Sequence, residues 1–169
     1  MSIVYANRGM GLETLIEHAN AQYASKGIAQ IQKIATPWKV IRKGKQIVSA
    51  FPEKKSTVDF IGVYGKGRAL AFDAKSTQNK TRIPLANFED HQIKFLLQCC
   101  RMGGSAFYII EFKTLGEIYY LHILDFFEWY SRFRNESLTL EWIRRKGIKV
   151  ESGNGIVLDY LKSVEEWSA

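Results

Sequence analysis

The stretch VDFIGVYGKGRALAFDAKS, residues 58–76, decides the fold of this chain. Its two apolar halves flank a Gly-Lys-Gly turn, and glycine supplies the positive φ angles that a short loop between strands needs, so we predict a β-hairpin. A three-residue loop places Tyr64 opposite Arg68, and the same register places Asp59 opposite Asp73. The sequence therefore predicts two carboxylates that face each other across one hairpin.

Two carboxylates this close repel each other unless a cation neutralises them. Side chains two residues apart share a face of a strand, so Lys75 joins Asp73, while Leu70 and Phe72 point the other way into a core. We expect the two aspartates to hold a divalent metal, with the lysine beside it. The alternative is an ordinary solvated strand face, and a one-residue change in loop length would move Asp59 to the opposite face.

Length and composition indicate a single globular domain over residues 1–169. Hydrophobic residues make up 46% and aromatic residues 13% of the chain, which excludes a disordered protein. Cys99 and Cys100 are adjacent and cannot join distant segments, which favours a reducing compartment and disfavours a zinc site. Because we find neither an uncharged apolar run of membrane-spanning length nor a basic leader, we expect a cytoplasmic protein with no membrane partner.

The chain is basic, with a net charge of +7 and a pI near 9.4, and its positive charge is concentrated in residues 36–55. The basic residues of this segment are Lys39, Arg42, Lys43, Lys45, Lys54 and Lys55, and its one acid is Glu53. Such a segment suits a polyanion, most commonly nucleic acid. Pro37 and Pro52 disfavour an amphipathic membrane helix and predict a projecting hairpin instead, with Trp38 and Phe51 among its basic residues. An ordinary solvated hairpin is the alternative.

The rest of the chain predicts further helices and strands without a repeat or a linker. The expected elements are a helix over residues 10–26, a strand over 28–35, a helix that begins at Asn87 and ends at Gly103-Gly104, strands over 105–112 and 118–124, and aromatic-rich helices beyond. Asn87 and Asp90 resemble a capping box for the second helix. Gln92 falls on the apolar stripe of that helix, where a buried amide needs a partner. This order predicts an α/β (α+β) fold with a mixed sheet flanked by helices.

Several motifs around the hairpin are similar to the RecU family of Holliday-junction resolvases, within the PD-(D/E)xK nuclease superfamily. They are NRGMGLE at residues 7–13, STVDFIG around Asp59, FDAKSTQNKTRIPLANFEDHQ at 72–92, and the basic segment inserted before Asp59. The acid-x-lysine motif alone is short and degenerate, but NKT, PL, NF and DHQ in this order make the resemblance specific. It covers about the first two-thirds of the chain well and the C-terminal third loosely. The resemblance implies a restriction-endonuclease-like central sheet, with segment 36–55 as a protruding stalk.

The resemblance also implies the site residues. Asp59, Asp73, Lys75 and Gln92 match the family's catalytic positions, and Asp59, Asp73, Gln92 and Glu13 are the implied ligand set for Mg²⁺, for which Mn²⁺ would substitute. The implied DNA-binding residues are Arg8, Lys39, Arg42, Lys43, Lys45, Lys54, Lys55, Lys80 and Arg82. Glu13 has an alternative explanation, because acids are favoured in the first turn of any helix.

Two residues depart from the family pattern. Val58 stands where the superfamily has a proline before the first acid. Asp73 stands where RecU proteins usually have glutamate. Aspartate is one methylene shorter, so this difference bears on the position and affinity of the metal, although both acids occur in the wider superfamily.

The implied function is the resolution of four-way DNA junctions by paired symmetric nicks, in recombination and repair. Symmetric nicks need two sites related by a two-fold axis, so a homodimer is implied, and RecU proteins are also linked to the strand-exchange recombinase. Two alternatives stay open, a restriction-like duplex endonuclease of the same superfamily and a non-catalytic junction-binding accessory of recombination. The intact set of Asp59, Asp73 and Lys75 favours an enzyme over the accessory.

Overall fold

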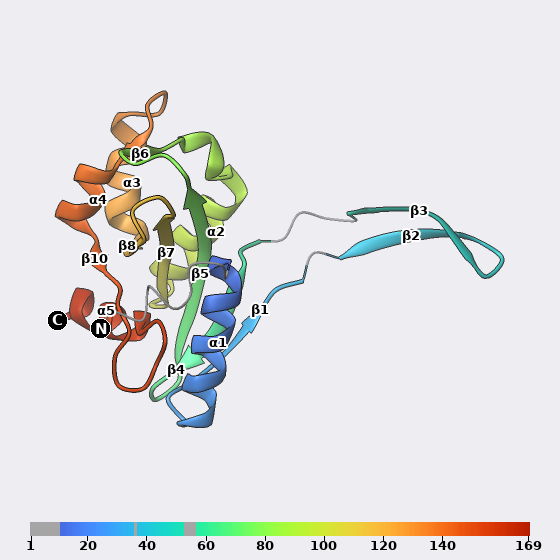
Figure 1. The fold of residues 1–169 in the computed structure, drawn as a ribbon, viewed down its shortest axis with the longest axis horizontal. Coiled ribbons are helices and arrows are strands. Elements are labelled where there is room, and N and C mark those ends of the chain that lie inside the picture. Colours follow the sequence, from blue (N-terminus) through green and yellow to red (C-terminus); the bar gives the residue numbers. More distant parts are fainter. Residues whose placement is uncertain (1–10, 36, 53–56) are drawn as a thin grey trace.

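The computed structural model describes residues 11–35, 37–52 and 57–169 of the chain. In chain order, its elements are α1 (Leu12–Ser25), β1 (Ala29–Lys33), β2 (Trp38–Lys43), β3 (Gln46–Pro52), β4 (Phe60–Tyr64), β5 (Arg68–Thr77), β6 (Arg82–Ile83), the 3-10 helix η2 (Leu85–Asn87), α2 (Asp90–Arg101), β7 (Ser105–Phe112), β8 (Glu117–His122), α3 (Ile123–Arg132), β9 (Leu138–Thr139), α4 (Leu140–Lys146), β10 (Ile148–Lys149) and α5 (Tyr160–Ser168). The main sheet of these residues has the strand order β1-β4-β5-β7-β8-β10, in which β5 and β7 pair in parallel. No helix in the described part of the chain is long and apolar enough to span a membrane. The mixed sheet flanked by helices that the sequence predicts is confirmed (Figure 1).

Helices cover both faces of this sheet, and each face buries its own hydrophobic cluster. On one face, α1 and α5 pack against Phe72 and Phe107. On the other face, α2, α3 and α4 pack against Ala71 and Tyr108, the sequence neighbours of those two residues. Successive side chains of a strand point to opposite faces, so β5 and β7 contribute to both clusters. A polar side chain on the central strands therefore lies in the interior and needs partners there.

The chain between β1 and β4 leaves the body of the protein as a hairpin formed by β2 and β3 (Figure 1). Its turn contains Gly44, whose φ of 62° is a conformation that glycine adopts readily. All residues of β2 are exposed, because a two-stranded ribbon has no second layer to pack against. The projecting hairpin predicted over residues 36–55 is therefore confirmed for its described part, residues 37–52.

The β4–β5 hairpin has the register that its loop length predicts. Tyr64 pairs with Arg68, and the antiparallel pairing continues toward the start of β4. Just beyond the last paired residues, Asp59 lies opposite Asp73 and the two residues share a hydrogen bond. The predicted opposition of the two aspartates is confirmed.

The predicted start of the second helix is wrong. α2 begins at Asp90 rather than Asn87, and its N-cap residue, Glu89, makes no side-chain capping hydrogen bond. Phe88 gives the physical reason, because its backbone is extended and its buried ring packs edge-on against Tyr108 at a centroid distance of 4.9 Å. Because this ring is directed into the core, η2 ends at Asn87 and α2 begins only at Asp90.

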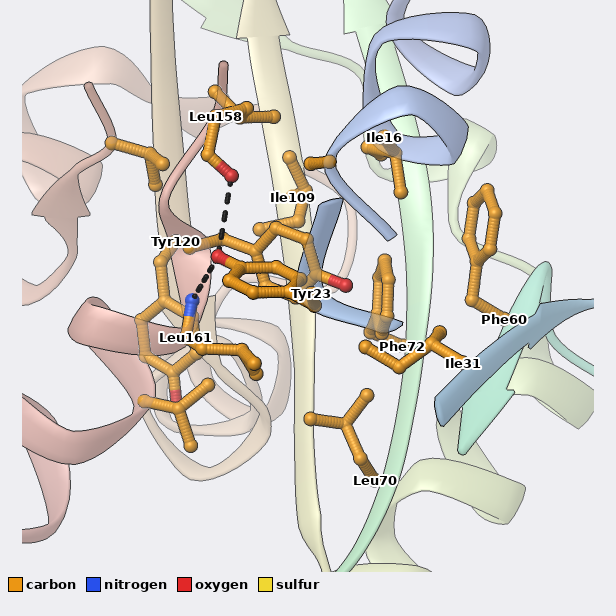
Figure 2. Close-up of a cluster of buried hydrophobic side chains, with 14 of the residues drawn as sticks. Ile16, Tyr23, Ile31, Phe60, Leu70, Phe72, Ile109, Tyr120, Leu158 and Leu161 are labelled. Carbon is orange, nitrogen blue, oxygen red and sulfur yellow. Dashed lines mark hydrogen bonds between the residues drawn. The ribbon is translucent and has the colours of Figure 1, made fainter. Parts of the chain in front are cut away.

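Tyr23 of α1 joins the C-terminal segment to the core. Its hydroxyl donates to Asp159 Oδ1 at 2.9 Å and accepts from the Leu161 amide at 3.1 Å. Figure 2 shows this hydroxyl between Leu158 and Leu161, inside the cluster. These contacts connect α1 to the segment that leads into α5.

We expect Tyr23→Phe to lower the free energy of unfolding by about 1–3 kcal/mol, because it leaves buried polar groups without a partner. Urea denaturation followed by circular dichroism measures this change. Tyr120→Phe is the matched control, because the Tyr120 hydroxyl is buried in the same cluster and has no hydrogen-bond partner in the part of the chain that the structure describes. Equal stability of the two variants would contradict a stabilising role for the Tyr23 hydrogen bonds.

Candidate active site

The end of the β4–β5 hairpin away from its turn brings two carboxyl groups together. The Asp59 amide donates to Asp73 Oδ1 at 3.2 Å, and the Ala74 amide donates to Asp59 Oδ2 at 2.9 Å. On the other side, the Ile34 amide that follows β1 donates to the Asp59 carbonyl at 2.7 Å. Backbone groups from three segments therefore fix the two acids relative to each other.

Asp73 is fully buried, and its carboxyl group also contacts Gln92 of α2 and Lys75. Gln92 Nε2 donates to Asp73 Oδ1 at 2.8 Å, and Gln92 Oε1 accepts from Lys75 Nζ at 3.0 Å. Lys75 Nζ lies 2.5 Å from Asp73 Oδ2 and forms an ion pair with it. The three side chains form a closed ring of contacts. Gln92 has the partners that its place on the apolar stripe predicts, and a solvated strand face is excluded for Asp73.

The charge balance of this ring favours a further cation. Burial raises the pKa of the Asp73 carboxyl above its ordinary value, the Lys75 ammonium opposes this shift, and the Asp59 carboxylate adds to it. One ammonium group thus faces two carboxyl groups in a low-dielectric interior. A bound cation would stabilise both carboxylates in their ionised form.

The donor atoms at this site suit a hard divalent metal. Asp73 Oδ2 is a buried carboxylate oxygen whose contact among the described residues is the Lys75 ammonium, and the half-buried Asp59 offers a second carboxylate. Within the described ranges, no three His, Cys, Asp or Glu side chains gather into a group that could hold a metal. Mg²⁺ does not need such a group, because it keeps several waters and is bound by one or two carboxylates together with substrate phosphates. The residues present therefore fit Mg²⁺ that shares its coordination with water and a phosphate.

Glu13, which the resemblance places in the metal set, contacts Lys33 of β1. Lys33 Nζ lies 2.7 Å from Glu13 Oε2 and 3.8 Å from Glu17 Oε2. The hydrogen bond to Glu13 is the largest factor that raises the pKa of Lys33, and the charge of Asp59 also contributes. Lys33 thus connects Glu13 electrostatically to the site, and a metal-binding role for Glu13 stays a prediction. Sequence reasoning missed Lys33, because a lysine at the end of a strand carries no distinguishing signal.

Part of the predicted DNA-binding set lies on the projecting hairpin. Its members there are Lys39, Arg42, Lys43 and Lys45. All four are exposed, and none forms an ion pair with an acid among the residues that the structure describes. Arg8, Lys54 and Lys55 lie outside the described residues.

The remaining two predicted DNA contacts, Lys80 and Arg82, follow the end of β5 and are both exposed. The NKT motif forms a local turn there, in which the Thr81 amide donates to Asn79 Oδ1 at 2.9 Å. Because β5 also carries Lys75, this turn continues the strand of the candidate site out to the surface.

Comparison with known proteins places the chain in one family. A family model described as RecU, Recombination protein U, matches residues 7–166. Holliday junction resolvase RecU of Pediococcus pentosaceus is 37% identical over 98% of this chain and 87% of its own length. Proteins of the same name from Streptococcus equi subsp. zooepidemicus and Staphylococcus aureus are each 37% identical, over 96% and 98% of this chain and 83% of their own lengths. This chain therefore belongs to the RecU family.

Proposed function

We propose that this protein is a metal-dependent endonuclease that resolves four-way DNA junctions by paired symmetric nicks, in recombination and repair. The observation that carries the proposal is the fully buried Asp73 carboxyl group, held by Gln92 and Lys75 and joined to Asp59. Burying ionised groups costs several kcal/mol per ion, and apolar residues in the same places are often as stable, so the cluster calls for a functional explanation. The name shared by the relatives, Holliday junction resolvase, supports the four-way junction as the substrate.

We assign Asp59 and Asp73 as the ligands of Mg²⁺, with Mn²⁺ as a substitute, and Gln92 as the residue that orients Asp73. When bound, the metal supplies a water of lowered pKa as the nucleophile and neutralises charge on the phosphate. The Lys75 ammonium, which contacts the same carboxylate, orients that water and stabilises the charge that develops on the phosphate oxygens. Gln92 fixes the positions of both side chains, because its Oε1 accepts from Lys75 and its Nε2 donates to Asp73. Glu13 acts from the outer shell, through its ion pair with Lys33.

The projecting hairpin is the part of the molecule that we propose to enter the centre of the junction. Its exposed lysine and arginine side chains can contact phosphates that converge at the branch point. Trp38 and Phe51 are 59% and 43% exposed, and aromatic rings on such a surface can stack on unpaired bases. Lys80 and Arg82, which follow β5 and are exposed, are the further phosphate contacts that we propose.

Replacing both Lys43 and Lys45 with alanine is expected to weaken junction binding and its salt dependence. Each lost phosphate contact lowers the slope of log affinity against log salt by about 0.9, so the slope should fall by about 2 for each hairpin. Fluorescence anisotropy with a labelled junction at several salt concentrations gives both quantities.

The matched control for the hairpin variant is the double change Lys26→Ala and Lys162→Ala, which removes two exposed lysines from the end of α1 and from α5. This control should keep the wild-type slope. If the hairpin variant also keeps the wild-type slope, the hairpin does not contact DNA phosphates.

Two matched nicks need two sites, and we propose that a two-fold homodimer of the single nuclease domain, residues 1–169, provides them. The strand-exchange recombinase is a further proposed partner, and binding between the two purified proteins tests it. For a DNA-processing protein of this kind, we propose a cytoplasmic location. These three proposals rest on the family resemblance.

Cleavage of an end-labelled four-way junction, compared with a linear duplex of the same arm sequence, tests the proposed function. We expect paired nicks at symmetric positions in the junction alone, in Mg²⁺ or Mn²⁺ and not in EDTA. Cleavage of the linear duplex at fixed sites would instead identify a restriction-like endonuclease. Tight junction binding without cleavage in any divalent metal would identify a non-catalytic accessory and would overturn the proposal.

A further inference from the structure

Tyr108 of β7 lies next to Asp73 in the centre of the sheet. The parallel register of β5 and β7 pairs Asp73 with Tyr108, so their side chains emerge from the same face of the sheet. Both residues are fully buried under the helices of that face. Tyr108 is therefore a direct neighbour of the residue that we propose as a metal ligand.

The Tyr108 hydroxyl has no hydrogen-bond partner among the described residues. Its ring is held by Phe88, edge-on at a centroid distance of 4.9 Å, and by Phe126 at 4.8 Å. Phenylalanine would fill this position with the same ring contacts and without a buried, unpaired hydroxyl, which is unfavourable. The tyrosine thus carries a polar group that packing does not explain.

The neighbouring carboxyl group can accept a further hydrogen bond, because each carboxylate oxygen has two acceptor sites. Asp73 Oδ1 accepts hydrogen bonds from the Asp59 amide and from Gln92, whereas Asp73 Oδ2 has one polar contact among the described residues, with Lys75 Nζ at 2.5 Å. Burial raises the pKa of Tyr108 well above its ordinary value, and the negative charge of Asp73 adds to the shift. The hydroxyl therefore stays a neutral donor, and the Asp73 carboxylate is the charged acceptor group beside it on the sheet.

We propose that Tyr108 is a positioning residue, whose hydroxyl donates through one bound water to Asp73 Oδ2 and holds the carboxylate in the orientation that receives the metal. This inference rests on the proposed function, because it assigns Tyr108 to the same metal site. An outer group that orients a ligating carboxylate increases its affinity for the metal without touching the metal itself. A water that bridges two buried polar groups satisfies both of them.

Tyr108→Phe is the test, and Tyr120→Phe is its matched control. Tyr120 is also a buried tyrosine whose hydroxyl has no hydrogen-bond partner within residues 11–35, 37–52 and 57–169, but it lies in the cluster on the opposite face of the sheet (Figure 2). The affinity of each protein for Mn²⁺, without DNA, is measured by electron paramagnetic resonance of the free ion. We expect Tyr108→Phe to bind Mn²⁺ about 10-fold more weakly than wild type and Tyr120→Phe to bind it equally well.

Cleavage at different metal concentrations supplies a second readout. Tyr108→Phe should cut junctions more slowly than wild type at low Mn²⁺ and regain the wild-type rate when Mn²⁺ saturates the site. A role confined to folding would change the melting temperature without this dependence on metal concentration. Wild-type affinity for Mn²⁺ in Tyr108→Phe, or equal losses in the two variants, would overturn the inference. If wild type itself neither binds Mn²⁺ nor cuts junctions, the proposed function fails as well, so the two failures are distinguishable.

Discussion

Replacing Asp73 with asparagine is expected to slow junction cleavage by about 1,000-fold or more, because the metal that we propose at this site would contribute several kcal/mol to stabilising the transition state. The amide keeps the shape of the side chain and can still accept a hydrogen bond from Gln92, but it removes the charge that we propose holds the metal. Junction binding should be as tight as in wild type or tighter, since a negative charge next to the DNA is lost. Single-turnover cleavage in Mg²⁺ and gel-shift binding in EDTA measure the two quantities separately.

Asp90→Asn is the matched control for this variant. Asp90 is an exposed aspartate at the start of α2, two residues from Gln92, and its carboxylate accepts a hydrogen bond from the Tyr130 hydroxyl. It lies near the candidate site but contacts neither of the proposed ligands, so this variant should keep most of the cleavage rate. If Asp73→Asn loses junction binding together with cleavage, Asp73 supports the structure rather than the chemistry.

Lys75→Met is expected to have the second largest effect, with cleavage slowed by about 100- to 1,000-fold, as when one transition-state donor is removed. Methionine retains much of the aliphatic stem of lysine but removes the ammonium group that contacts Asp73 and Gln92. Single-turnover rates at saturating Mg²⁺ measure the loss. Arginine at this position would keep the charge, so Lys75→Arg should retain more activity than Lys75→Met, and equal rates would contradict a role for the charge.

Lys75→Met should also be less stable than wild type, by an amount that depends on pH. Lys75 opposes the rise in the pKa of Asp73, so without it the pKa of the buried carboxyl lies even further above its unfolded value. A carboxyl group with a raised pKa in the folded state destabilises the protein increasingly as pH rises from the unfolded pKa through the folded one. In EDTA, Lys75→Met should therefore lose more thermal stability, relative to wild type, at pH 8 than at pH 5. A loss that is equal at both pH values would mean that the ion pair does not stabilise the fold.

The sequence was sufficient to predict the features that follow local rules. The opposition of Asp59 and Asp73 depends only on a three-residue loop and on the alternation of strand residues, and the observed register confirms it. Gln92 is a polar residue on an apolar helical stripe, which predicts that its amide has hydrogen-bond partners. Asp73 and Lys75 are those partners. Such inferences need no knowledge of distant segments.

Features that depend on distant segments could not be predicted in the same way. The burial of Asp73 requires β7 to pair with β5 and α2 to cover both strands. The sequence of the hairpin alone predicts neither of these contacts. Phe88 overrode the local capping signal at Asn87, because its ring packs against β7. The two-residue strands β6, β9 and β10 are too short to show a period of two. Tyr108 was indistinguishable from its apolar neighbours in SAFYIIEF until the sheet placed it beside Asp73.

The location of the metal is the point on which the account depends most, and iron-directed cleavage of the protein tests it most directly. Fe²⁺ takes the place of Mg²⁺, ascorbate and hydrogen peroxide generate hydroxyl radicals at the bound ion, and mass spectrometry maps where the chain is cut. We predict cuts close to Asp59, Asp73 and Gln92, which excess Mg²⁺ suppresses and which Asp73→Asn abolishes. Cuts at other acids of the chain, unchanged in Asp73→Asn, would contradict the assignment of the hairpin carboxylates as the metal site.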